Sequence, residues 1–202
     1  MRSKVEKYRI KLSFLAILLF LLSIYFLNNR WEENHPMLAD SFYALSVFLV
    51  AIASLGRMWC SLYIAGYKNS KLITTGPYSL CRNPLYFFSM LGVLGIGFAT
   101  ETALFPLVLM VPFALYYPFV IKSEETRLAA LFGEEYDEYK RQVPAFFPRL
   151  SGFREPDAYL VKPGIYRKHM FSALWFIWLV GIIDVVGELR EMGLGTSLWT
   201  LH

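Results

Sequence analysis

Hydrophobic residues in this chain fall into five long runs that are separated by shorter polar segments. A membrane-spanning helix needs about 20 predominantly apolar residues, and each run has nearly that length. Tyr, Trp and Lys at the ends of the shorter runs are expected to reach the membrane interface. The pattern predicts an all-α, polytopic membrane protein with about five transmembrane helices. The runs cover roughly residues 12–28, 38–56, 85–100, 102–121 and 170–187.

A further helix is predicted directly after the fourth run. We expect an amphipathic helix on the cytoplasmic surface of the bilayer, broken or bent at Gly133 and ended near Pro144. Its aromatic stripe favours packing over chemistry. The residues that recur at the spacing of one helical face are Leu128, Leu131, Phe132, Tyr136 and Tyr139.

The composition supports the membrane assignment. Hydrophobic residues make up 56% of the chain, which is above the usage of soluble domains. The first run is not a typical cleavable signal, because its apolar core is long and residues 25–30 lack a small-residue cleavage site. We therefore expect a single membrane domain over residues 1–202.

Lys and Arg concentrate in alternate polar segments. They lie before the first run, between the second and third runs, and after the fourth, while the remaining segments carry more acids than bases. The positive-inside rule predicts a cytoplasmic N-terminus, an external C-terminus and cytoplasmic loops after the second and fourth runs. The net charge of +4 is explained by basic residues beside anionic lipid, so no nucleic-acid partner is expected. The absence of an organelle-targeting signal favours a prokaryotic inner (plasma) membrane.

Cysteine and histidine give no indication of a metal centre. Cys60 and Cys81 fall on the predicted cytoplasmic side and are expected to be reduced thiols. His35, His169 and His202 are scattered, and no Cys/His cluster has the spacing of metal ligands. No metal is therefore expected.

One candidate segment for chemistry lies at the start of the third run and reads GPYSLCRNPLY over residues 76–86. Asn83 and Pro84 are expected to begin the helix, as its cap and its first-turn proline. The positive end of the helix dipole then faces the interface, where an anion can bind. A turn, a cap and an arginine reaching the interface would explain the same residues without chemistry.

The second candidate segment follows the fourth run. Glu124 and Glu125 near a helix C-terminus would oppose the helix dipole, so they need partners. These are either hydroxyl or ammonium groups of a ligand, or an ion pair with Lys122 or Arg127. The run itself contains prolines that can kink a helix and open space between helices, although ordinary membrane helices carry such prolines too.

In this order, with a proline-rich apolar run between them, the two segments resemble the signature of the isoprenylcysteine carboxyl methyltransferase / phospholipid methyltransferase family of integral membrane enzymes. The resemblance covers about residues 57–148 and leaves 149–202 as a C-terminal extension with an additional transmembrane helix. It implies an S-adenosylmethionine-dependent methyltransferase with a lipophilic or small-molecule acceptor that enters from the membrane lipid. The cofactor-pocket residues that it implies are Tyr78, Arg82, Asn83, Tyr86, Glu124 and Glu125.

One position departs from the family. Asn83 stands where the family commonly has histidine, and an amide cannot act as a general base near neutral pH. Transfer to a carboxylate or thiolate needs no base, because the protein then mainly aligns the reactants and excludes water. Arg82 or Arg57 could hold an anionic acceptor, so Arg82, Asn83 and Arg57 are the candidate catalytic residues. An amine acceptor would have to lose a proton, and the sequence offers no obvious base.

Two other functions fit the sequence. Some sterol reductases share the helical core of this family, so an NADPH-dependent membrane reductase is an alternative, although it predicts more spans. A non-enzymatic scaffold or transporter subunit would bind no cofactor. The absence of charged residues well inside the third and fourth runs argues against an ion path. The acceptor, whether carboxylate, thiol or amine, stays open.

Overall fold

The computed structural model describes residues 35–67 and 70–189, together with 20, 22, 23, 27–29, 192 and 199–201. The first predicted run therefore lies mainly outside the described residues. The helices in this part of the chain are α3 (Pro36–Ile64), α4 (Pro77–Leu80), α5 (Pro84–Phe98), α6 (Leu104–Phe132), α7 (Glu134–Gln142), α8 (Pro163–Ala173) and α9 (Trp175–Leu189), with a 3-10 turn, η1, at Leu150–Gly152.

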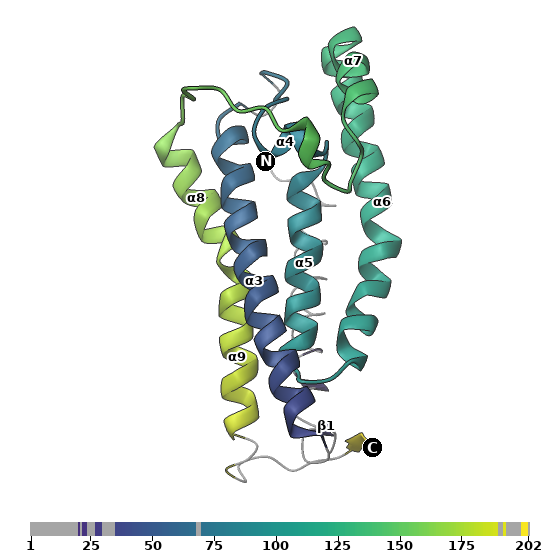
Figure 1. Cartoon of the computed structure of the whole chain (residues 1–202), viewed down its shortest axis with the longest axis vertical. Coiled ribbons are helices and arrows are strands. Elements are labelled where there is room, and N and C mark those ends of the chain that lie inside the picture. The colour runs from purple at the N-terminus through teal and green to yellow at the C-terminus, as the bar shows by residue number, and fades with distance from the viewer. Residues whose placement is uncertain are drawn as a thin grey trace, which may run out of the picture.

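The regular secondary structure of the described residues is almost entirely helical, as predicted. The exception is a short parallel pair of strands, β1 (Leu27–Asn29) and β2 (Trp199–Leu201). The last residues of the first predicted run thus belong to a strand. This pair joins the chain just before α3 to the chain beyond α9, at the end of the bundle opposite α4 (Figure 1).

Three helical segments have the length and apolarity needed to cross a membrane. They are α3, α6 and the combined span Pro163–Leu189, while the apolar helix α5 is shorter. The predicted count of five spans is therefore not reached in the part of the chain that the structure describes. The fifth run also differs from its prediction, because its helical segment begins at Pro163 and is divided at Leu174 into α8 and α9.

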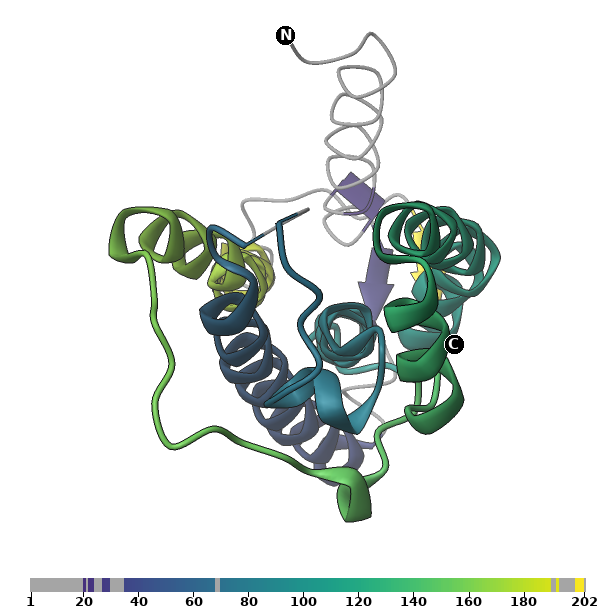
Figure 2. The same cartoon turned by 90° about the horizontal axis from the view of Figure 1, so that it is seen from above.

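The long helices lie side by side, with α3 and α5 in contact and α6 and α9 beside them (Figures 1 and 2). A buried apolar cluster that includes Val50, Ile96 and Val180 joins α3, α5 and α9. Gly95 permits the close approach of α5 to α3, since a Cβ there would lie 2.7 Å from Val50 Cγ2. Small residues at a helix interface typically permit such close packing of membrane helices.

Helix α6 continues well past the predicted fourth run and ends at Phe132. Glu124 and Glu125 consequently lie inside a helix, not at its end. Gly133 adopts φ +52° and separates α6 from α7, which confirms the predicted break, and α7 ends at Gln142, close to Pro144 as predicted. Its location on the bilayer surface stays a prediction.

The aromatic stripe around this break packs against the protein. Tyr136, Tyr139 and Val143 form a buried cluster with Leu72, and Leu128 packs against it. The cluster ties α7 to the segment between α3 and α4. Both sequence motifs therefore meet at one end of the bundle (Figure 1). Which side of a membrane this end faces stays a prediction.

Candidate functional site

The turn before α4 requires a glycine. Gly76 has φ +61°, and a Cβ at this position would lie 2.3 Å from Tyr63 Cζ. Pro77 then begins the single turn of α4. The backbone N–H of Gly76 donates to Arg154 O at 2.8 Å, and the N–H of Arg82 donates to Pro144 O at 2.8 Å. These bonds fix the first motif against the chain that follows α7.

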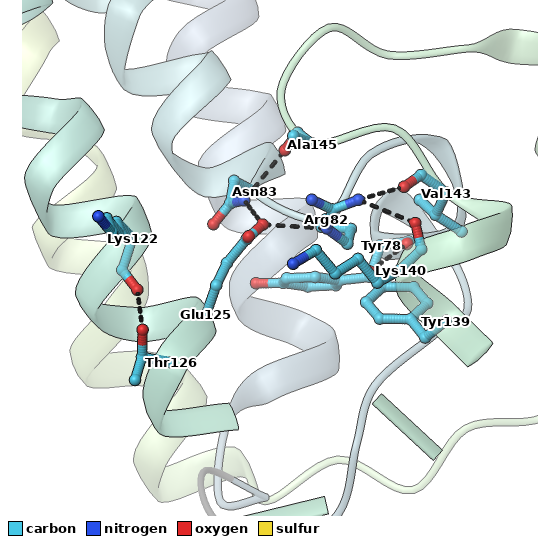
Figure 3. A network of polar contacts seen from close by, with 10 residues as sticks. All are labelled: Tyr78, Arg82, Asn83, Lys122, Glu125, Thr126, Tyr139, Lys140, Val143 and Ala145. Atoms are coloured by element: carbon cyan, nitrogen blue, oxygen red, sulfur yellow. Dashed lines mark hydrogen bonds and ion pairs between the residues drawn. The ribbon is translucent and has the colours of Figure 1, made fainter. Parts of the chain in front are cut away.

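The centre of the site is a polar network around one carboxylate oxygen (Figure 3). Glu125 Oε1 accepts from Arg82 Nε at 2.9 Å and from Asn83 Nδ2 at 3.1 Å. Arg82 Nη1 also donates to Val143 O at 2.7 Å, and Asn83 Nδ2 also donates to Ala145 O at 3.0 Å. The network joins the first motif, the glutamate pair and the segment after α7, which are far apart in the sequence.

The ion pair in this network is largely shielded from water. The Arg82 side chain is 9% exposed and that of Glu125 is 17% exposed. Removing one partner of such a pair leaves a buried charge without compensation, which costs about 3–5 kcal/mol. The network is therefore expected to stabilise the packing of the first motif against α6 and the segment after α7.

Asn83 precedes α5, as predicted for a cap, but its side chain makes no capping hydrogen bond. Instead, its amide nitrogen is engaged by Glu125 and Ala145, and the residue is buried. Asn83 thus positions Glu125 and the 143–145 segment through hydrogen bonds from its amide. An amide does not act as a general base near neutral pH, so these bonds give Asn83 a positioning role.

A cavity of about 260 Å³ lies among α3, α5, α6, α7 and α8, and we call it the polar cavity. It brings together five of the six cofactor-pocket residues implied by the sequence, together with Arg57. Glu124 on its wall is paired with Arg127, whose Nε donates to Glu124 Oε2 at 3.1 Å. This is one of the two partners that the sequence suggested. The predicted residues that line the polar cavity are Arg57, Tyr78, Arg82, Asn83, Tyr86 and Glu124.

A second and larger cavity, of about 830 Å³, lies between α5, α6, α7 and the 146–147 segment. We call it the apolar cavity. Glu125 lines this cavity and not the polar one, because successive residues on an α-helix point about 100° apart. Glu124 and Glu125 thus serve different cavities, separated by the Arg82–Asn83–Glu125 network. The apolar side chains that line the apolar cavity include Met90, Met110, Phe113, Ile121, Phe146 and Phe147.

Arg57 reaches the polar cavity from α3. Its Nη1 donates to Ser89 Oγ on α5 at 2.5 Å, and its guanidinium lies 5.4 Å from the ring centre of Phe176. Among the described residues, its buried Nε has no hydrogen-bond partner. A guanidinium with a buried donor left over is suited to an anionic group.

Tyrosine and cysteine side chains near the network stay protonated at neutral pH. Burial raises the pKa of Tyr78 and of Tyr139 well above that of an exposed phenol, and it raises the pKa of Cys81 to about 12. Tyr139 therefore acts as a donor, and its hydroxyl bonds Tyr78 O at 2.7 Å. Cys60 and Cys81 are both buried and unbridged.

Several residues that line the polar cavity were not predicted as site residues, and two of them come from α8. His169 and Ser172 on α8 line it, although they belong to the predicted C-terminal extension. The sequence predicts an apolar helix over roughly 170–187, but not that a helix beginning at Pro163 packs against α3 beside the first motif. Only the tertiary arrangement brings α8 and the first motif to the same cavity.

These features define a helical protein with spans of membrane length and a buried polar network between two cavities at one end. The chain belongs to the phospholipid methyltransferase family, which matches residues 37–135. This match confirms the resemblance carried by the two motifs. Together with the three helical segments of membrane length, it shows that the protein is an integral membrane protein. The family match begins and ends earlier than the predicted 57–148.

Relatives of known name fall into two groups. The chain is 37% identical over 199 residues to the cobalt-zinc-cadmium resistance protein CzcN of Cupriavidus metallidurans, covering 98% of this chain and 90% of that protein. It is 36% identical over 189 residues to the nickel-cobalt-cadmium resistance protein NccN of Alcaligenes xylosoxydans xylosoxydans, covering 94% and 87%.

The other group is represented by an enzyme. The chain is 29% identical over 130 residues to the protein-S-isoprenylcysteine O-methyltransferase of Schizosaccharomyces pombe, covering 61% of this chain and 53% of that protein. No solved structure matches the chain.

Proposed function

We propose that this protein is a membrane methyltransferase that moves a methyl group from S-adenosylmethionine to a lipophilic or small acceptor. The observation that carries the proposal is the gathering of Tyr78, Arg82, Asn83, Tyr86 and Glu124 around one cavity. These residues come from two motifs about forty positions apart in the sequence. Family membership supports the same reaction class.

The polar cavity suits a zwitterionic cofactor. Its wall carries both a carboxylate, Glu124, and guanidinium groups, Arg57 and Arg82. The buried Nε of Arg57 has no partner among the described residues and could bind the carboxylate of the cofactor's amino-acid part. Glu124 could accept from ribose hydroxyls or from an ammonium group. The cofactor supplies an electrophilic methyl group on a sulfonium centre.

The apolar cavity suits the tail of a lipophilic acceptor. It lies between α5 and α6, next to faces of α6 that leave Leu115 and Phe119 exposed. At its polar end are Glu125 and Lys140. An acceptor held there would present its reacting group at the network that separates the two cavities. Alignment across this network, with water excluded, is the contribution expected of the protein.

Two relatives are named as metal-resistance proteins, which favours a role for this reaction in resistance to metal ions. We propose that methylation of a membrane component, rather than the transport of a metal, is how this protein would serve such resistance. An acceptor screen in cells challenged with cobalt, zinc or cadmium would test this role.

Calorimetry of S-adenosylmethionine binding to the protein in lipid nanodiscs tests the proposed function. We expect saturable binding by the wild type and at least tenfold weaker binding by Glu124→Gln, which removes a charge from the cavity wall. Glu138→Gln is the matched control, since Glu138 pairs with Arg141 on the exposed face of α7. NADPH is the competing ligand of a reductase. Binding of NADPH in place of S-adenosylmethionine, or no binding by folded wild type, would contradict the proposal.

A further inference from the structure

One buried hydroxyl group at the apolar cavity lacks a hydrogen-bond partner. Tyr136 on α7 is 1% exposed and lines this cavity. Among the described residues, its hydroxyl makes no hydrogen bond of suitable geometry, although Glu125 and Arg82 lie close enough to influence its pKa. A buried polar group left without a hydrogen bond costs stability and is rare in native proteins. We therefore expect a molecule in the cavity to complete this bond.

The Tyr136 hydroxyl is available as a donor at neutral pH. Burial raises its pKa to about 12, and the nearby negative charge of Glu125 contributes to the rise. The phenol therefore keeps its proton and can donate it in a hydrogen bond to an oxygen atom of a ligand.

The charges around the apolar cavity are unbalanced. Glu125 is compensated by Arg82, whose Nε lies 2.9 Å from Glu125 Oε1. Lys122 and Lys140 also line the cavity, and neither makes an ion pair within the part of the chain that the structure describes. Their positive charges favour an anion in the cavity and repel an ammonium group.

Lys140 and Tyr136 reach the cavity from one face of α7. They are four residues apart, so they are neighbours on the helix surface. The backbone oxygen of Lys140 accepts from Arg82 Nη1 at 3.1 Å, and the Lys140 side chain extends from α7 toward Glu125 (Figure 3). A hydroxyl donor and an ammonium group are thus held together beside the buried network.

Apolar and charged side chains line opposite ends of this cavity. Phe113, Tyr117, Ile121 and Glu125 recur at four-residue spacing on α6 and line it along the helix. The lining is therefore apolar near Phe113 and becomes charged toward α7. Its volume of about 830 Å³ is in the range of pockets that enclose a small-molecule ligand. A molecule with an apolar chain and an anionic head matches both ends.

We propose that Tyr136 and Lys140, together with Lys122, bind the anionic head group of the acceptor, an amphiphile whose chain occupies the apolar part of the cavity. This inference deepens the proposed function and rests on it, because the amphiphile is the molecule to be methylated. It narrows the acceptor to an anion, such as a carboxylate or a phosphate, and disfavours the amine that the sequence left open. Tyr136 and Lys140 lie beyond the family match, which ends at residue 135.

Four radiolabelled probes with the same apolar chain test this inference: dodecanoate, dodecyl phosphate, dodecanol and dodecylamine. Scintillation proximity measures their binding to the full chain in phosphatidylcholine nanodiscs, and empty nanodiscs give the partitioning into lipid that is subtracted. We expect an anionic probe to bind at least about tenfold more tightly than the alcohol and the amine. The comparison of dodecanoate with dodecyl phosphate identifies which head group the site prefers.

Two variants locate the head-group site. Tyr136→Phe should bind the preferred anion about tenfold more weakly, as expected for the loss of a hydrogen bond to a charged group, and should bind dodecanol as the wild type does. Lys140→Gln should also bind the anion more weakly, and its binding should depend less on salt. Tyr116→Phe and Lys168→Gln are the matched controls, because neither residue lines the polar or the apolar cavity.

A stability measurement separates ligand binding from a structural role. Because the Tyr136 hydroxyl has no partner among the described residues, Tyr136→Phe should not lower the free energy of unfolding of the ligand-free protein, whereas loss of a structural hydrogen bond would lower it. Dodecylamine binding as tightly as the anions, or anion binding unchanged in both Tyr136→Phe and Lys140→Gln, would overturn the inference. Wild-type protein that binds the anion but shows no binding of S-adenosylmethionine in calorimetry would overturn the proposed function while leaving the head-group site in place.

Discussion

Arg82→Met is the perturbation that probes the buried network most severely. The side chain donates three hydrogen bonds, to Glu125 Oε1, Val143 O and Lys140 O, at 2.9, 2.7 and 3.1 Å. It is 9% exposed, and its ionic partner is 17% exposed. The substitution keeps most of the volume but removes the cationic partner of the Glu125 carboxylate, which retains the hydrogen bond from Asn83 Nδ2. We expect a loss of about 3–5 kcal/mol in the free energy of unfolding.

Equilibrium unfolding in mixed micelles, followed by circular dichroism, measures this loss. The double variant with Glu125→Gln should cost less than the sum of the single variants, with a coupling of about 0.5–3 kcal/mol, because the second substitution removes the stranded charge. Arg141→Met is the matched control and should leave stability unchanged, since its ion pair with Glu138 is exposed. Strictly additive single variants, or an Arg82→Met protein as stable as the wild type, would refute the reasoning.

Two further predictions concern the first motif. Gly76→Ala should lower the free energy of unfolding by about 1–3 kcal/mol, because φ is +61° and the new Cβ would meet the Tyr63 ring. The same unfolding assay measures this loss, and an unchanged midpoint would contradict the prediction. Burial raises the pKa of Cys81 to about 12, against about 8.5 for an unfolded thiol, so the folded state binds this proton more tightly. The stability contribution is present below about pH 8.5 and is lost as pH rises towards about 12. At pH 8, iodoacetamide should label Cys81 in unfolded protein only, and equal labelling of folded protein would show the thiol to be accessible and ionisable.

Much of the fold could be predicted because it depends on local pattern. Apolar runs of membrane length, Pro84 at the start of α5, and Gly133 at the break between α6 and α7 each have a short-range physical cause. The continuation of α6 past the apolar run was less visible, since it depends on polar residues such as Glu124 and Arg127 pairing along the helix.

The sequence indicated which residues form the candidate site, but not how they are arranged in it. The motifs indicated which residues gather, and the polar cavity brings most of them together. Their division between two cavities could not be derived, because it depends on how α6 is rotated against α5. Likewise, the bond from Asn83 to Ala145 O and the position of His169 arise from contacts between distant segments. Such contacts cannot be inferred from the spacing of residues along the sequence.

The location of the cofactor is the central claim, and ultraviolet cross-linking of methyl-labelled S-adenosylmethionine, followed by peptide mass spectrometry, tests it most directly. The account predicts label on peptides that contain residues 76–86 and 124–127, with labelling suppressed by excess unlabelled cofactor and reduced in Glu124→Gln. Label confined to peptides that do not line the polar cavity, or no competable label on folded protein, would contradict the account.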